Sequence, residues 1–258
     1  MAAPLGDIRG FLEAVAYREV HPRPPGRKAY HPFVTISRQT GAGGHTLARV
    51  LLQAINKEDD PLFQGWQVFD RELCKKLMED PTLHVSMQSL LTEEYRSEVE
   101  DAIFSLLGGE TPRYTVVKKL FETIRMLGAL GRVIIVGRVG MCVTRGLPGG
   151  VHIRLVASEA TRVKRMVGLL QVSEKEAREM IYKHDRDRAR LVRDHFSRDI
   201  HDPLLYDATW NTDAASFEDI AASVIALIKR RAQRHQAVAG EAPQASSAAS
   251  IREATNVV

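Results

Sequence analysis

Apolar positions along the chain alternate between short runs and longer stretches with helical spacing. The runs Phe33-Val-Thr-Ile and Arg132-Val-Ile-Ile-Val are continuous and rich in β-branched residues, as is Val151-His-Ile-Arg-Leu-Val. Such continuous runs are typical of strands that are buried on both faces of a parallel sheet. Two shorter segments, residues 67–69 and 206–210, complete a set of five predicted strands.

Helical patterns follow these predicted strands. Leu47, Val50, Leu51 and Ile55 share one helix face directly after the first strand. Further helices are predicted over residues 71–79, 92–107, 112–130 and 217–228, and another begins at residue 159 after the N-cap residue Ser158. Alternating strands and helices predict an α/β fold with a doubly wound parallel sheet, whose functional sites lie at the C-terminal ends of the strands.

The two ends of the chain differ from the middle. Residues 1–30 combine a short amphipathic pattern with a proline-rich basic stretch, and we expect an appendage that packs on the core; the pattern consists of Ile8, Phe11, Leu12 and Val15. The main domain is predicted over residues 31–231. Residues 232–258 are rich in Ala, Ser, Gln and Glu and are predicted to be a disordered tail, because they have too few large apolar groups to offset the entropy of ordering.

Composition narrows the function classes. No apolar run is long enough to span a bilayer and no secretory signal is visible at the N-terminus, so we expect a cytoplasmic protein without membrane contact. Cys74 and Cys142 fall far apart in apolar helical patterns, which favours buried thiols over a bridge or a metal pair. The net charge of +4 is compatible with nucleic acid or with a small anionic substrate. Basic segments without interleaved aromatic residues make nucleic acid the weaker alternative.

The most informative segment is the loop after the first strand, Ser37-Arg-Gln-Thr-Gly-Ala-Gly-Gly-His-Thr46. Glycines allow backbone N–H groups to approach phosphate oxygens, and the following helix adds the positive end of its dipole. The common phosphate-loop pattern GxxxxGK[ST] would place glycine at Arg38 and lysine at Gly44. A tight turn without a ligand is the alternative interpretation of these glycines.

Two further segments suggest contacts with anions. Gly137-Arg138-Val139-Gly140 follows the predicted strand at residues 132–136. Arg186, Arg190 and Arg193 are spaced so that they share one face of a helix, within a charge-dense segment of residues 184–198. This segment is compatible with a solvated, ion-paired helix and with a lid whose arginines hold phosphoryl oxygens and exclude water.

Together these segments resemble the nucleoside monophosphate kinases, and specifically the cytidylate kinase-like family. The resemblance covers roughly residues 31–230 and rests on Ile36–Gly44, on Val133–Arg138, on Asp185–Arg190 and on Asp207 near the last strand. It implies the fold of a P-loop kinase with a helical monophosphate-binding insertion and an arginine-rich lid at about residues 184–200. It also implies ATP and Mg²⁺ at the first loop and a nucleoside monophosphate as the acceptor.

The resemblance assigns roles to individual residues. Those expected to bind ATP are Arg38, Thr40, Gly41, Ala42, Gly43, Gly44, His45 and Thr46, with Thr46 also at the metal. Asp70 and Arg138 are expected to bind the acceptor, and Arg186 and Arg190 to act on the transferring phosphoryl group. Arg38 is our candidate to replace the charge of the lysine that Gly44 lacks. Asp70 is equally compatible with a helix N-cap, and His45 with a solvent-facing residue.

Two functional hypotheses follow. The first is a kinase that moves the γ-phosphoryl group of ATP to a nucleoside monophosphate, most simply CMP or dCMP, by direct in-line transfer. The second is a nucleotide-binding regulatory protein of the same fold with little or no turnover. The missing lysine favours the regulator, whereas the retained arginines favour the kinase. The sequence carries no signal for the oligomeric state.

Overall fold

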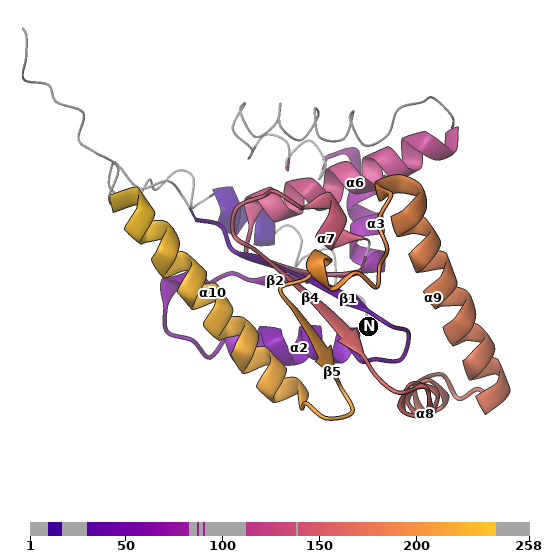
Figure 1. Ribbon diagram of the computed structural model, residues 1–258. Helices are drawn as coiled ribbons and strands as arrows, with labels where there is room; N and C mark the ends of the chain where they lie inside the picture. The colour runs from indigo at the N-terminus through magenta and orange to yellow at the C-terminus, as the bar shows by residue number, and fades with distance from the viewer. Residues whose placement is uncertain are drawn as a thin grey trace, which may run out of the picture.

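A five-stranded parallel sheet forms the centre of the molecule (Figure 1). The computed structural model describes residues 10–16, 30–82, 87, 90, 112–137 and 139–240. Its strands are β1 (Phe33–Arg38), β2 (Gln67–Phe69), β3 (Val133–Val136), β4 (Gly150–Val156) and β5 (Ala208–Asn211), in the order β2-β3-β1-β4-β5. This arrangement confirms the predicted doubly wound α/β fold.

Strand β1 is central and pairs in parallel with both β3 and β4. Its register places Ser37 opposite Arg154 of β4, and Ile36 opposite Val136 of β3. The chain moves to one side of β1 to form β2 and β3 and to the other side to form β4 and β5. A doubly wound sheet opens a crevice at such a switch point, at the C-terminal end of the central strand.

Helices cover both faces of the sheet (Figure 1). Helices α2 (Gly44–Ile55) and α10 (Phe217–Gly240) pack on the face to which β1 contributes Val34 and Ile36. The opposite face is covered by α3 (Arg71–Glu79), α6 (Pro112–Leu130) and α7 (Gly140–Val143). Because side chains alternate along a strand, Phe33, Thr35 and Ser37 of β1 point to this second face. Near the strand end, that face therefore carries hydroxyl groups.

Two helices stand beside the C-terminal edge of the sheet. Helix α8 (Glu159–Leu170) begins at the N-cap Ser158, as predicted, and α9 (Glu174–Phe196) begins with a capping box between Ser173 and Glu176. The predicted lid at residues 184–200 falls on the second half of α9 and the turn after it. Short 3₁₀ helices at Pro61–Phe63 and Pro203–Leu205 complete the described elements.

Several boundaries differ from the predictions. The last strand begins at Ala208 rather than at Tyr206, because Asp202 caps the short helix Pro203–Leu205 immediately before it. Helix α10 continues to Gly240, so residues 232–240 are helical rather than part of a disordered tail. The predicted helix at residues 92–107 and the rest of the tail lie outside the described residues.

The appendage at the N-terminus packs on the core, as expected. Residues 10–16 are helical, and Phe11, Leu12 and Val15 are buried in the cluster beneath α6. The ring centroid of Phe11 lies 5.3 Å from that of Phe69 in an edge-to-face arrangement. Ile8 and the proline-rich basic stretch lie outside the described residues.

Cys74 and Cys142 are both buried and form no disulfide with each other, which confirms the interpretation of both as core thiols. Burial raises the pKa of Cys142 to about 11, so its thiol stays protonated at neutral pH. Among the described helices, none combines the length and the apolar content that a bilayer crossing requires.

Candidate functional site

The glycine-rich loop leaves the start of α2 open to a ligand. Gly41 and Gly43 have φ angles of 80° and 89°, a conformation that favours glycine, and Gly43 is the N-cap residue of α2. No side chain caps this helix and no acidic residue lies in its first turn. By contrast, Asp70 caps α3. The uncapped amides and the helix dipole of α2 therefore form an anion-binding position.

Arg38 crosses the position at which the common loop pattern has lysine. A Cβ atom at Gly44 would lie 3.0 Å from Cγ and 3.1 Å from Cδ of Arg38. A Cβ atom at Gly137 would collide with the guanidinium group of the same side chain. The two glycines therefore leave room for Arg38, and its charge lies between the phosphate loop and the turn after β3. This placement supports the hypothesis that Arg38 substitutes for the absent lysine.

Two cavities meet at this loop. The first, here called the loop cavity, has a volume of about 450 Å³. It is bounded by residues 38–41 and 43–46 of the loop and by the side chains Arg165, Met166, Leu169, His184, Arg188 and Phe217. The predicted ATP-binding residues lie along it, with the exception of Ala42, which is fully buried beneath the loop.

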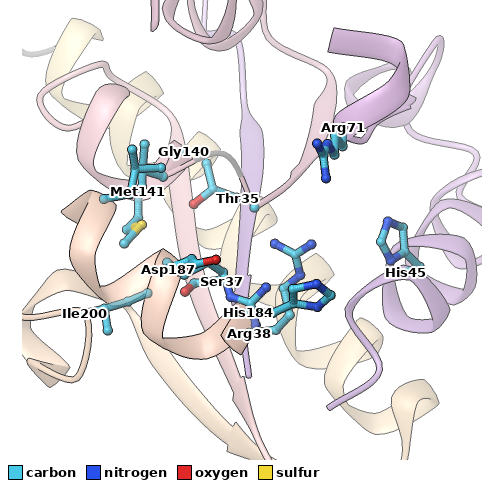
Figure 2. A pocket seen from close by; sticks show the side chains of 14 residues that line it. Thr35, Ser37, Arg38, His45, Arg71, Gly140, Met141, His184, Asp187 and Ile200 are labelled. Carbon is cyan, nitrogen blue, oxygen red and sulfur yellow. The ribbon is translucent and has the colours of Figure 1, made fainter. Parts of the chain in front are cut away.

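The second, here called the inner cavity, has a volume of about 400 Å³ and extends along β1 (Figure 2). Its floor includes Thr35 and Ser37. Figure 2 shows Met141 and Ile200 at one end and the basic side chains of Arg71 and His45 at the other. Arg38, His45, His184 and Arg188 line both cavities. The boundary between the two spaces is therefore made of basic side chains.

Helix α9 is attached to the phosphate loop through Asp185. Its Oδ1 atom accepts hydrogen bonds from the backbone N–H of Thr40 at 2.8 Å and from the Thr40 hydroxyl at 2.9 Å. Its Oδ2 atom accepts from Nη1 of Arg162 on α8 at 2.8 Å. Arg188 donates to the same Oδ1 and to the Thr40 hydroxyl. The carboxylate thus holds two arginines and the loop together.

The arginines that reach the cavities are not the ones that the spacing singled out. Arg186 lies over the ring of Tyr182 with its side chain about half exposed, and Arg190 is also exposed. Neither lines the loop cavity or the inner cavity, whereas Arg188 lines both. On the residues described, the face of α9 that meets the two cavities carries Arg188, and the roles of Arg186 and Arg190 in transfer stay a prediction.

A different spacing in the same segment identifies the inward face. The residues of α9 that line the inner cavity are His184, Asp187, Arg188 and Leu191, which are spaced i, i+3, i+4 and i+7. The buried residues Ala177, Ile181 and Val192 form an apolar stripe that continues on this side of the helix. That stripe was readable in the sequence. The arginine triplet of residues 186, 190 and 193 lies on the solvent-facing side instead.

Of the two predicted acceptor-binding residues, only Asp70 belongs to the described part of the chain. Asp70 is the N-cap of α3, and its carboxylate accepts 3.0 Å hydrogen bonds from the N–H groups of Glu72 and Leu73. It does not line the inner cavity, although the next residue, Arg71, does. Arg138 lies outside the described residues. Beside it, Val139 has a φ angle of 52°, and strain of this kind in a β-branched residue is a common feature of functional sites.

His45 stands at the mouth of both cavities. Partial desolvation, and secondly the charge of Arg38, lower its pKa below the usual value, while Asp70 opposes this shift. The ring is therefore neutral at physiological pH and acts there as a hydrogen-bonding group. Arg38 and Arg188 supply the fixed positive charge next to it.

The donors at the loop fit a magnesium ion that is carried by phosphates. Thr46, the predicted metal contact, lines the loop cavity. Among the described residues there is no cluster of three His, Cys, Asp or Glu side chains that could hold a metal without a substrate. Mg²⁺ is usually bound by one or two protein oxygens together with substrate phosphates and water, so a single hydroxyl group is compatible with it.

The surroundings of His152 on β4 predict that the protein loses stability in acid. Its Nδ1 atom lies 2.8 Å from the hydroxyl of Thr35, and burial lowers its pKa from 6.5 to about 4. Because the unfolded chain binds this proton more readily, the stabilisation is complete above pH 6.5 and is lost as the pH falls through 4. This loss amounts to about 3 kcal/mol of unfolding free energy.

The measurement is urea unfolding at a series of pH values between 7 and 4. His152→Asn keeps an acceptor for Thr35 and removes the titrating ring, so its stability should change less with pH than that of the wild type. His184→Asn, at an exposed position, is the control. Its unfolding free energy should depend on pH as that of the wild type does. If the unfolding free energy of His152→Asn changed with pH as much as that of the wild type, His152 would not be the source of the acid sensitivity.

Comparisons with known proteins concern the family and the fold of the chain. The model of the cytidylate kinase-like family matches residues 33–214. A solved structure of an uncharacterized protein from Eubacterium ventriosum ATCC 27560 is 19% identical, with a TM-score of 0.57 and coverage of 78% of this chain and 99% of that chain. A shikimate kinase from Acinetobacter baumannii in complex with shikimate is 15% identical, with a TM-score of 0.38 and coverage of 78% and 94%. No curated protein sequence matches the chain.

Proposed function

Because the chain belongs to the cytidylate kinase-like family, a family of nucleotide kinase-type phosphotransferases, we propose that it transfers the γ-phosphoryl group of ATP to a nucleoside monophosphate. CMP and dCMP are the proposed acceptors. The matched segment contains the phosphate loop, the five strands of the sheet and helices α8 and α9.

The observation that carries the proposal is the shared basic boundary between the two cavities. Direct phosphoryl transfer needs a donor and an acceptor in line, with positive charge around the group that passes between them. Arg38 and Arg188 lie at this boundary, together with His45 and His184. ATP phosphates in the loop cavity and the acceptor phosphate in the inner cavity would meet at these four residues.

Each part of the site then has a proposed role. The backbone amides at the start of α2 hold the outer phosphates of ATP, and Arg38 supplies the charge that Gly44 lacks. Thr46 would hold a magnesium ion, which when bound neutralises the phosphate charge. Arg188 stabilises the transferring group, and Asp185 positions it. The acceptor oxygen is already a nucleophile, so no general base is required.

The inner cavity fits an acceptor that is anionic at one end and planar at the other. Basic side chains lie near the loop, and the apolar Met141, Leu191 and Ile200 extend away from it. A nucleoside monophosphate has this distribution of charge. Asp187 and the hydroxyls of Thr35 and Ser37 add hydrogen-bonding groups between the two ends.

The test is an ADP-release assay with ATP, Mg²⁺ and each common monophosphate in turn. We expect turnover with CMP and dCMP, with kcat/KM at least roughly tenfold above that for AMP, GMP or UMP, since buried hydrogen bonds to a base discriminate strongly. Calorimetric titration with ATP provides the parallel measurement of binding. Protein that binds ATP but turns over no acceptor would contradict the kinase and support the regulatory protein of the same fold.

A further inference from the structure

Arg154 on β4 is a buried cation that has no acidic partner among the described residues. Its exposed fraction is 4%, and within the described part of the chain its guanidinium contacts no carboxylate. Nη1 donates to the hydroxyl of Ser37 at 3.1 Å and to that of Tyr206 at 3.3 Å, and Nη2 lies 3.3 Å from Nδ1 of His201. The group also lies over the Tyr206 ring. Burying a cation among neutral groups is costly unless an anion compensates for it.

The directions of the hydrogen bonds indicate where that anion binds. Tyr206 has one hydroxyl proton, and it is donated to the carbonyl of Ile200 at 2.9 Å. The hydroxyl oxygens of Ser37 and Tyr206 both accept from Arg154. The proton of Ser37 is therefore directed either to the Tyr206 oxygen at 3.3 Å or to a ligand. Polarisation by the guanidinium makes this hydroxyl a strong donor.

Ser37 is also part of the floor of the inner cavity, next to Thr35 and Arg38. A ligand group bound over Ser37 would therefore contact a hydroxyl donor that is itself hydrogen-bonded to the positively charged guanidinium of Arg154. We propose that Ser37 and Arg154 form an anion subsite in this floor, and that it receives a phosphate oxygen of the acceptor. This inference rests on the proposed function for the identity of the acceptor, but the subsite itself is defined by its affinity for phosphate.

A purely structural network would need no charge at this position. The Tyr206 hydroxyl already donates to the carbonyl of Ile200 within the segment between α9 and β5, and that bond does not involve Arg154. A neutral side chain of similar length could fill the space beside the Tyr206 ring. The charge itself is explained by the cavity, because Ser37 connects the guanidinium to a wall of the inner cavity.

The experiment measures binding of inorganic phosphate, CMP and cytidine by calorimetry, with ADP present to occupy the phosphate loop. Ser37→Ala should weaken phosphate and CMP binding roughly tenfold or more, the usual effect of losing a hydrogen bond to a charged group, and should leave cytidine and ADP binding unchanged. Arg154→Gln should have the same effect. Arg154→Lys should restore part of the phosphate affinity, because it keeps the charge. Ser223→Ala, a partly exposed position on α10 remote from the inner cavity, is the matched control.

The outcomes separate the subsite from the proposed function. Selective loss of phosphate and CMP binding in Ser37→Ala supports the subsite, even if the wild type turns over no monophosphate and the proposed function fails. Equal loss for cytidine and CMP would overturn the subsite, as would unchanged phosphate affinity or a wild type that does not bind phosphate beside ADP. If Arg154→Gln does not fold, Ser37→Ala and Arg154→Lys still give these results.

Discussion

Replacing Arg38 by alanine is expected to lower turnover roughly a hundredfold, which is the usual effect of removing one preorganised charged donor from a transition state. The physical reason is the position of the side chain, which crosses Gly44 and reaches the turn at Gly137. Affinity should fall more for ATP than for ADP and more for ADP than for AMP, because the proposed contact is with the outer phosphates. Steady-state kinetics and calorimetry with the three nucleotides provide the measurement.

A second set of variants tests whether a lysine at position 44 can replace the charge of Arg38. Gly44→Lys alone should lower turnover, because the new side chain must displace Arg38 from the space above residue 44. The double variant Arg38→Ala with Gly44→Lys should recover part of the turnover that Arg38→Ala loses. Arg49→Ala, an exposed arginine on the same helix α2, is the matched control for loss of one positive charge. Equal loss of affinity for ATP, ADP and AMP would identify Arg38 as a scaffold of the loop.

Arg188→Met is expected to lower turnover by about a thousandfold, the lower end of the effect measured for arginines that stabilise a transferring phosphoryl group. Arg188 lines both cavities and is held by Asp185 and Thr40. Arg188→Lys should recover little, because a point charge cannot reproduce the fork of the guanidinium. ATP affinity should change far less than turnover.

Matched variants on α9 test the assignment of its inward face. Arg186→Lys and Arg190→Lys should stay close to wild-type turnover, and so should Arg178→Met, which removes an exposed pair with Glu159. Asp185→Asn should lower turnover with a smaller effect on folding, because the amide keeps one acceptor for Thr40 but loses the charge that holds Arg162 and Arg188. A large loss of turnover at Arg186 or Arg190, with a small loss at Arg188, would instead support Arg186 and Arg190 as the arginines that act on the transferring phosphoryl group.

Much of the fold was predictable because it depends on local patterns. Continuous β-branched runs predicted β1, β3 and β4, and helical periodicity predicted the helices that cover them. The glycines before α2 predicted a loop that exposes backbone amides, since a φ angle near 90° at Gly43 is a property of that residue and its neighbours. The buried thiols followed from the same apolar spacing. In each case the signal lies within one element of the chain.

The side chains that make up the site were decided by contacts between distant segments. Spacing alone could define several faces of α9, and packing against the core selected the one with Arg188. Arg38 lies over residue 44, where the common loop pattern has lysine, because the turn at Gly137 leaves room for it beside the loop, and Arg154 reaches Ser37 because β4 pairs with β1. The sequence by itself determined the elements and the anion-binding loop. Only the tertiary structure decided which cations meet there, because the direction of a long charged side chain is set by neighbours that are far away in the sequence.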